Sequence, residues 1–257
     1  MLVPDLDIGR RFVMEHKPPG TMLLCSVTGA HHYGFPSKDS DIDLKGIHLA
    51  PTDSLLGLNS PVETKNRLEI FEEVECDFTS HEARKAFKLL ISGNGNILER
   101  ICSPYQLFDT PFVEDIRALA LGSVSKRYSG HYLGYFHGMC KEHERNVKPR
   151  AKSLLYTYRV ALTGVHLMRT GRIEADLNIN APVYGFTEIL ELIQFKRERG
   201  EKSALPTPLD QTLRSRWGEL EKLLQDSVEK SGLPDEAANG DDWEAWLKNK
   251  RMSVGLK

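Results

Sequence analysis

The sequence has neither a long hydrophobic run nor a cysteine pattern. Among its 257 residues, no apolar stretch approaches the roughly 20 residues that a membrane-spanning helix needs. Its four cysteines, Cys25, Cys76, Cys102 and Cys140, lie far apart, without a CxxC pair or a Cys/His cluster at zinc-binding spacing. We therefore expect reduced thiols that pack as small hydrophobic side chains, no structural zinc and no membrane partner.

A large excess of charge of either sign is also missing. The 34 Lys and Arg residues nearly balance 36 Asp and Glu residues, which excludes a strongly basic arm but leaves room for a local basic groove. The first residues, MLVPDLDIGRRF, place acids where a signal peptide has bases and an apolar run, which predicts a cytoplasmic protein. The length fits one large domain or two modest ones.

Hydrophobic patterning predicts mixed strands and helices up to about residue 110 and helices beyond it. The expected early elements are a helix over 7–17 and strands over 22–27, 41–49 and 70–78. Thr79-Ser80-His81-Glu82 fits a capping box at the start of the next helix. We predict a later helix over 152–169 with Gly171 as its cap, and a short helix over 243–250. These patterns indicate an α+β fold with one domain over 1–110 and a helical domain over 111–257, which contains an acidic linker near 227–242.

Two carboxylates open the second predicted strand. Asp41 and Asp43 are two residues apart, so their side chains point to one face of the strand, about 7 Å apart along the chain. Same-face acids repel each other unless a cation lies between them, and hard oxygen ligands suit Mg²⁺. Glu75 and Asp77 share a face of the third predicted strand, and Asp77 would join the pair if that strand lies beside the second. Three carboxylates can hold two Mg²⁺ ions about 3.5–4 Å apart for in-line nucleotidyl transfer.

A glycine turn precedes these acids. Gly29 follows the apolar run 22–27 and permits a tight turn, so that its amide and that of Ala30 would face a phosphate. Taken separately, a Gly-Ala turn is most often a simple turn, and an SDxD sequence is most often a solvated acidic loop or a helix cap. Their close spacing after a buried strand favours a phosphate and metal site.

The stretch TGAHHYGFPSKDSDIDLKGIHLAP resembles the signature of the DNA polymerase β nucleotidyltransferase superfamily. It is most similar to predicted nucleotidyltransferases associated with RNA repair, whose pattern is G-S-x-x-Y-G, a spacer and S-D-x-D-x-x-G. The matching positions are Gly29, Tyr33, Gly34, Ser40, Asp41, Asp43 and Gly46. A second stretch, DFTSHEARKAFKLLISGNGNILE, resembles a later block of that family; this match selects Asp77 over Glu75 and marks Lys85, Asn94 and Glu99. The family's loop serine is Ala30 in this chain, so one hydroxyl contact to the triphosphate is lost.

A polar stripe follows one side of the predicted helix over 152–169. Its members, at helical spacing, are Lys152, Tyr156, Arg159, Thr163 and His166. The alternative interpretation is a solvated helix face. The stripe nevertheless resembles the family's K-x-x-x-H/Y-x-x-R helix, and Lys126 resembles an upstream family lysine. The resemblance implies that Lys126, Lys152, Tyr156 and Arg159 bind the nucleotide and that the helix closes over it.

Together, these features predict a metal-dependent nucleotidyltransferase with a polymerase-β-type palm, a small mixed sheet flanked by helices. Asp41 and Asp43 would bind both Mg²⁺ ions, with Mn²⁺ as a substitute ion, and Asp77 would complete the site. Gly29, Ala30 and Ser40 would bind an NTP such as ATP. The resemblance implies an RNA 3′ end as the acceptor hydroxyl, as in RNA repair. The alternatives are nucleotidylation of a protein or small molecule, and a nucleotide- or RNA-binding module that has lost turnover.

Overall fold

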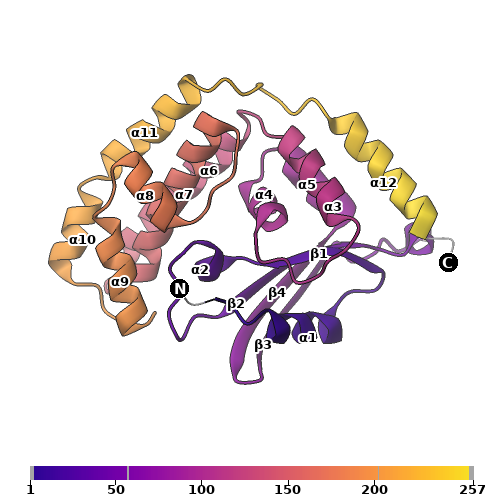
Figure 1. Ribbon diagram of the computed structural model, residues 1–257, viewed down its shortest axis with the longest axis horizontal. Helices are drawn as coiled ribbons and strands as arrows, with labels where there is room; N and C mark the ends of the chain where they lie inside the picture. The colour runs from indigo at the N-terminus through magenta and orange to yellow at the C-terminus, as the bar shows by residue number, and fades with distance from the viewer. Residues whose placement is uncertain (1–2, 57, 202, 255–257) are drawn as a thin grey trace. The chain divides into compact units, whose positions relative to one another are not determined.

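The chain forms two compact units. The computed structural model describes residues 3–56, 58–201 and 203–254. The first unit, here called the sheet unit, consists of Val3–Gly29, Asp41–Val124 and the segment from Glu236 onward. The second, the helical unit, consists of Ala30–Ser40 and Ser125–Asp235. Figure 1 labels the helices and strands of both units.

A four-stranded mixed sheet forms the centre of the sheet unit. Its strands are β1 (Thr21–Val27), β2 (Ile42–Leu49), β3 (Thr64–Phe71) and β4 (Val74–Glu82). Their order is β1-β2-β4-β3; β2 runs parallel to β4, whereas the other two pairs are antiparallel. This small mixed sheet with flanking helices confirms the predicted α+β class.

Apolar and polar residues alternate along β2 and β4, so one face of the sheet is apolar and packs into a buried core. Phe12 and Val13 of α1 (Leu6–His16) pack there with side chains of β2 and β4: Ile42, Leu44, Cys76 and Phe78. Because successive side chains of a strand point to opposite faces, the intervening Asp43, Lys45 and Asp77 lie on the other face. The core therefore fixes which face the polar residues occupy.

Short helices complete the sheet unit. They are the 3₁₀ helix η1 (Thr52–Leu55) and the α-helices α3 (Ala83–Ile91), α4 (Gly95–Cys102), α5 (Val113–Gly122) and α12 (Gly240–Val254). In Figure 1, α1 lies on one side of the sheet and α3 and α4 lie on the other. Side chains cap the first turns of these helices: the carboxylate of Asp5 accepts from two amides of α1, and the amide oxygen of Asn94 accepts from Ile97 N in α4.

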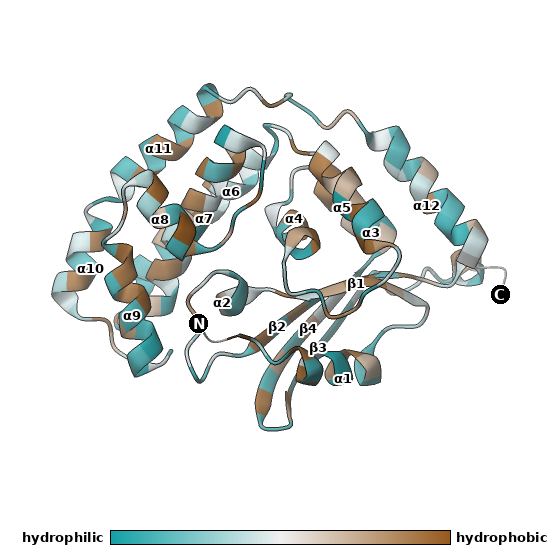
Figure 2. Cartoon of the chain, in the orientation of Figure 1, coloured by the Kyte–Doolittle hydropathy of each residue, from teal (hydrophilic) through white to brown (hydrophobic). Residues whose placement is uncertain are grey.

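The predicted third strand over 70–78 is wrong, because a two-residue turn divides it. β3 and β4 form a hairpin closed at the Phe71–Val74 pair, and Glu72 and Glu73 have φ angles of +47° and +67°. Two successive positive φ angles are typical of a type I′ turn, for which the usual sequence signal is a glycine. Apolar and polar residues alternate on both sides of this acidic turn (Figure 2), which made it resemble one continuous strand.

The predicted capping box at Thr79–Glu82 is also wrong. β4 continues through these residues, with Thr79 paired to Lys45 on one side and to Asn66 on the other. Strand pairing on both sides satisfies the backbone groups that a cap would have served. The helix α3 instead begins at Ala83, where the Glu82 carboxylate accepts a hydrogen bond from Arg84 N at 2.8 Å.

The helical unit is organised around one central helix. That helix, α7 (Ala151–Thr170), packs against α6, α8, α9 and α11. The prediction of a helix over 152–169 is confirmed, as is its cap, because Gly171 has φ +67° and donates to Leu167 O at 2.9 Å. The other helices are α2 (Gly29–His32), which begins at the last residue of a sheet-unit segment, α6 (Tyr128–Arg145), α8 (Leu177–Tyr184), α9 (Ile189–Arg199), α10 (Thr207–Arg214) and α11 (Trp217–Glu229). Throughout the described residues, no helix combines the length and hydropathy needed to cross a membrane.

The two units do not follow the predicted division of the chain at a single boundary near residue 110. The C-terminal α12 returns to the sheet unit, where the Trp243 ring lies 4.3 Å from that of Phe87 and its indole N–H donates to Ser123 Oγ at 2.8 Å. The expected linker near 227–242 is shorter, since α11 ends at Glu229 and α12 begins at Gly240. Aromatic packing between segments far apart in sequence produced this arrangement, and no local pattern indicates it.

Candidate functional site

Two of the predicted carboxylates meet in the sheet unit. Asp43 and Asp77 are directly paired residues of the parallel strands β2 and β4, so their side chains share a face with backbones about 4.8 Å apart. The β2–β4 ladder begins at the Ile42–Cys76 pair, and Glu75 precedes it. The strand register therefore pairs Asp43 with Asp77 and not with Glu75.

A lysine lies between these two carboxylates. The Lys45 ammonium donates to Asp77 Oδ2 at 2.7 Å and is 3.6 Å from Asp43 Oδ1. Lys45 and Asp43 have only 20% and 18% of their side-chain surface exposed. The Asp77 side chain is 39% exposed, and the lysine places a positive charge beside both carboxylates.

Gly29 lies against the same carboxylate. Its φ is +63°, and a Cβ added there would stand 1.7 Å from Asp43 Oδ2. Thr28 N also donates to Asp43 O at 2.8 Å, which ties the end of β1 to the start of β2. Only glycine fits this backbone conformation and this close approach.

The third predicted acid, Asp41, occupies a different position. It is half-buried and directly precedes the first residue of β2. Among the residues that the structure describes, no three His, Cys, Asp or Glu side chains are grouped so that they could hold a metal ion. The structure therefore pairs Asp43 with Asp77 across the strands, and Asp41 lies at the entrance to β2.

The paired carboxylates have the chemistry of a divalent-cation site. Mg²⁺ is commonly held by one or two carboxylates, and waters and substrate phosphates complete its shell. Asp43 and Asp77 provide such a hard-oxygen pair, and Lys45 already places a positive charge between them. The chemistry of this pair fits a divalent metal ion.

The polar stripe on α7 is not a solvated helix face. Arg159 is 1% exposed, and its guanidinium carbon lies 3.8 Å from the centre of the Tyr33 ring. The Tyr156 ring packs edge-on against Tyr33 and Phe35, with ring centres 5.6 and 5.5 Å apart. Tyr33, from the segment between β1 and β2, thus packs beneath the stripe, and both Arg159 and Tyr156 are held in place.

A buried lysine holds the end of the same segment. The Lys196 ammonium, from α9, has no exposed surface and donates to Phe35 O, Ser37 Oγ and Ser40 Oγ at 3.0–3.2 Å. Its ion partner is Glu201, at 2.9 Å. Ser40, predicted to bind nucleotide, is therefore a hydrogen-bonding partner within the helical unit.

The pKa values of this ion pair reflect burial and mutual charge. Burial lowers the pKa of Lys196, and Glu201 partly offsets that effect. Burial opposes ionisation of Glu201, but hydrogen bonds and charges from Lys196 and Lys152 outweigh it and lower the pKa of this carboxyl group. Lys152 lies 3.0 Å from Glu201 Oε2, so the predicted nucleotide ligand Lys152 belongs to the same network.

The remaining predicted residues are placed separately. Ala30 is 2% exposed, and its carbonyl accepts a hydrogen bond from Phe35 N at 3.0 Å. The Lys126 ammonium lies 3.3 Å from Asp235 Oδ1, after the end of α11. The described residues that line the pocket at the start of α7 include Lys152 and Tyr156 but not Lys126.

Sequence reasoning missed Lys45 and Lys196, which hold other side chains in place, and the hydrogen-bonded series of Lys85, Thr64 and His81. Lys45 could have been found, because the alternation that pairs Asp41 with Asp43 extends to position 45. Lys196 had no signal, since a lysine in a charged helical segment is normally exposed. Lys85, which the family pattern marks, donates to Thr64 Oγ1 at 2.7 Å, and that hydroxyl lies 3.0 Å from His81 Nδ1.

The structure thus shows an α+β protein with two facing carboxylates on the inner strands of a small mixed sheet. The chain belongs to the RNA repair pathway DNA polymerase beta family, whose sequence model matches residues 10–247. Nucleotidyltransferases typically use divalent metal ions.

The chain is similar to a protein known from its sequence and to a protein of solved structure. An uncharacterized protein of Methanocaldococcus jannaschii, MJ0002, is 26% identical over 216 residues, which cover 82% of this chain and 86% of that protein. A solved structure of a nucleotidyltransferase-like protein from Exiguobacterium sibiricum 255-15 is 10% identical with a TM-score of 0.34, and the match covers 98% of this chain and 78% of that one.

Proposed function

We propose that this protein transfers a nucleoside monophosphate from an NTP to an acceptor hydroxyl and releases pyrophosphate. The observation that supports this most strongly is the pairing of Asp43 with Asp77 across parallel strands, with Lys45 between them. Membership of a polymerase β family supports the same reaction class. In this reaction a bond forms between the acceptor oxygen and the α-phosphorus, while the bond from that phosphorus to the leaving pyrophosphate breaks.

The proposal assigns metal binding to the acids of β2 and β4. Asp43 and Asp77 would hold Mg²⁺, with Asp41 at the start of β2 as a further ligand and Mn²⁺ as a substitute ion. Bound divalent ions would lower the pKa of the acceptor hydroxyl and stabilise charge on the triphosphate. The role of the protein residues is to hold the carboxylates in register, with Gly29 keeping the space beside Asp43 open.

Nucleotide binding is assigned to a second group of residues. The amides of Gly29 and Ala30 would contact the triphosphate, and Lys152, Tyr156 and Arg159 of α7 would contribute cationic and aromatic contacts. Ser40 and Lys126 belong to the same proposal, as residues at positions marked by the family pattern. The buried packing of Arg159 against Tyr33 supports a preformed arrangement on α7.

The proposed acceptor is an RNA 3′ end, which rests on the family's RNA repair description. The test supplies each of the four NTPs, labelled at the α-phosphate, with Mg²⁺ and RNA primers that differ at their 3′ ends. Asp43→Asn and Asp77→Asn should reduce label transfer at least about 100-fold. Glu75→Gln is the matched control on the same strand and should stay within about threefold of wild type.

Two results would contradict the proposal. Label transfer that survives both Asp43→Asn and Asp77→Asn would exclude these carboxylates as the metal-binding pair. Label that appears on protein in cell extract, and never on RNA, would show that the acceptor is a protein side chain.

A further inference from the structure

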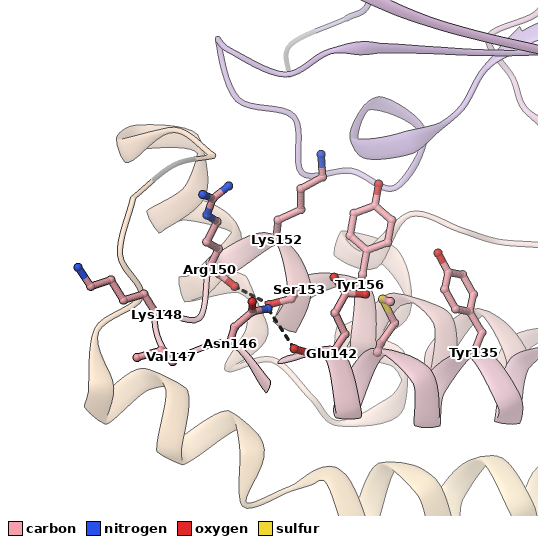
Figure 3. Close-up of a pocket in the computed structure, with 10 residues that line it drawn as sticks. Tyr135, Glu142, Asn146, Val147, Lys148, Arg150, Lys152, Ser153 and Tyr156 are labelled. Atoms are coloured by element: carbon pink, nitrogen blue, oxygen red, sulfur yellow. Dashed lines mark hydrogen bonds between the residues drawn. The ribbon is translucent and has the colours of Figure 1, made fainter. Parts of the chain in front are cut away.

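The helical unit has a pocket, and several of the residues that line it have no role in the proposed reaction. It has a volume of about 730 Å³ and lies at the end of α6, the start of α7 and the connection between them. Ligand pockets of small molecules typically measure about 300–1,000 Å³, so this one has room for at least one nucleotide unit. Figure 3 shows its lining residues.

The lining combines cations with aromatic rings. Lys148, Arg150 and Lys152 supply positive charge, and Tyr135 and Tyr156 supply rings. In Figure 3 the side chains of Lys152, Tyr156 and Tyr135 extend in the same direction from α6 and α7. Among the described lining residues, Glu142 is the one acid. Cations that contact phosphates, together with aromatic rings that stack on bases, are typical of sites for single-stranded nucleic acid.

The wall of the pocket is fixed by a buried polar network. His143, which is 1% exposed, lies 2.7 Å from Ser153 Oγ through Nδ1 and 2.7 Å from Asp210 Oδ1 through Nε2. Ser153 lines the pocket one residue after Lys152, and its hydroxyl is also 3.0 Å from Arg150 O. The last turn of α6 and the first turn of α7 are therefore tied together, which lowers the cost of ordering the basic side chains when a ligand binds.

The positive charge extends past the pocket along the chain. Residues 141–152, KEHERNVKPRAK, contain five basic and two acidic residues in a chain whose net charge is −2. Lys148 and Arg150 are exposed. A run of cations of this length matches successive phosphates of a polymer better than it matches one free nucleotide.

We propose that this pocket binds a single-stranded nucleic-acid segment. Its backbone phosphates contact Lys148 and Arg150, and one base packs against Tyr135. The inference rests on the proposed function, because it names the site for the polymeric acceptor of that reaction. It concerns residues Tyr135, Lys148 and Arg150, to which the transfer reaction itself assigns no role.

The test is direct binding without catalysis. A fluorescein-labelled single-stranded RNA of about 12 nucleotides, within the usual range of site sizes, is titrated with protein in EDTA without NTP, and fluorescence anisotropy gives the Kd. The double variant Lys148→Glu/Arg150→Glu should weaken binding at least about tenfold and reduce the salt dependence, the slope of log K against log salt, by about 1.4. Tyr135→Ala should weaken binding severalfold while leaving that slope unchanged, because stacking does not release counterions.

The matched control is Lys222→Glu/Lys230→Glu on and just after α11. These two exposed lysines do not line the pocket, and reversing them changes the net charge by the same amount. We expect less than about a threefold change in Kd. Equal losses in both double variants would show that net charge alone drives binding and would overturn the proposal.

A competition experiment separates a polymer site from an NTP site. Unlabelled ATP is added to the preformed complex of wild-type protein and labelled RNA. Displacement by ATP, with loss of ATP binding in Lys148→Glu/Arg150→Glu, would make the pocket an NTP site and overturn the proposal. The two proposals fail in different ways. If RNA binds through the pocket but no label is transferred, only the proposed function is refuted. If label is transferred and the pocket variant has an unchanged KM for RNA, only this inference is refuted.

Discussion

Asp43 of β2 and Asp77 of β4 face the same ammonium, that of Lys45, which lies 3.6 Å from the first carboxylate and 2.7 Å from the second. Their pairing across parallel strands brings the two negative charges together, and a cation between them offsets their repulsion. Lys45 provides one such cation, and a divalent metal would provide a stronger one. This competition can be measured without any knowledge of the acceptor.

Replacing Lys45 by methionine should make the protein depend on a divalent metal for stability. In EDTA, Lys45→Met leaves two facing carboxylates without their cation, so Tm should fall by several degrees, at about 2–4 °C per kcal/mol for a chain of this size. Added Mg²⁺ should restore Tm and shift it further than in wild type, since binding stabilises the folded state. Thermal unfolding followed by circular dichroism measures both. Lys45→Met/Asp77→Asn is the control, and an equal Mg²⁺ response in that variant would exclude Asp77 as a ligand.

Gly29→Ala should disrupt the acid pair and the fold around it. The new methyl group would lie 1.7 Å from Asp43 Oδ2 on a residue with φ +63°, and both features are unfavourable. We expect a loss of at least about 2 kcal/mol in the free energy of unfolding, measured in urea. Gly218→Ala in α11 is the matched control, because a Cβ there meets no described atom within 4 Å. That change should be neutral or stabilising by up to about 1 kcal/mol, and equal losses in the two variants would contradict the explanation.

Lys196→Met should destabilise the helical unit strongly. The substitution removes three hydrogen bonds to the segment from Phe35 to Ser40 and leaves Glu201 without its buried ion partner. Removing one partner of a buried ion pair typically lowers the free energy of unfolding by about 3–5 kcal/mol. The double variant Lys196→Met/Glu201→Gln should recover part of that loss, and the urea-unfolding free energies of the four proteins form a double-mutant cycle. Additive losses would show that the two residues act independently.

The stability of the sheet unit should fall in mild acid because of His81. Burial, with the charges of Arg100 and Lys85, lowers the pKa of His81 to about 4. The Thr64 hydroxyl accepts from Lys85 and lies 3.0 Å from His81 Nδ1, so His81 belongs to a hydrogen-bonded series beside a cation. An unfolded histidine has a pKa of about 6.5, so between these values the unfolded chain binds a proton that the folded protein excludes, and the free energy of unfolding rises with pH across that window.

Comparison of urea unfolding at about pH 5 and about pH 7 in wild type and His81→Gln checks this prediction. The wild-type protein should lose stability at the lower pH, and the variant should lose less. An identical pH dependence in the two proteins would assign the acid sensitivity to other groups, such as His48, whose pKa burial also lowers.

The parts of the fold that could be predicted from sequence are those with strong local signals. The helix α7 and its Gly171 cap followed from helical spacing and a left-handed glycine. The face of β2 that Asp43 and Lys45 occupy followed from a period of two, which holds wherever one face of a strand is buried. The Glu72–Glu73 turn did not follow, because it adopts positive φ angles without a glycine to signal them. Thr79 likewise had the sequence of a cap but lies in β4, where pairing on both sides outweighs a local preference.

The sequence alone determined the chemical composition of the site: a glycine at the end of one strand, spaced acids on the next, and cations with a tyrosine on a long helix. Tertiary structure alone decided which groups meet. It paired Asp43 with Asp77 through strand register, placed Lys45 between them, and buried Arg159 and Lys196 where an isolated helix would expose them. The physical reason is that side-chain spacing is a property of the local backbone, whereas register and burial depend on contacts between segments far apart in the chain.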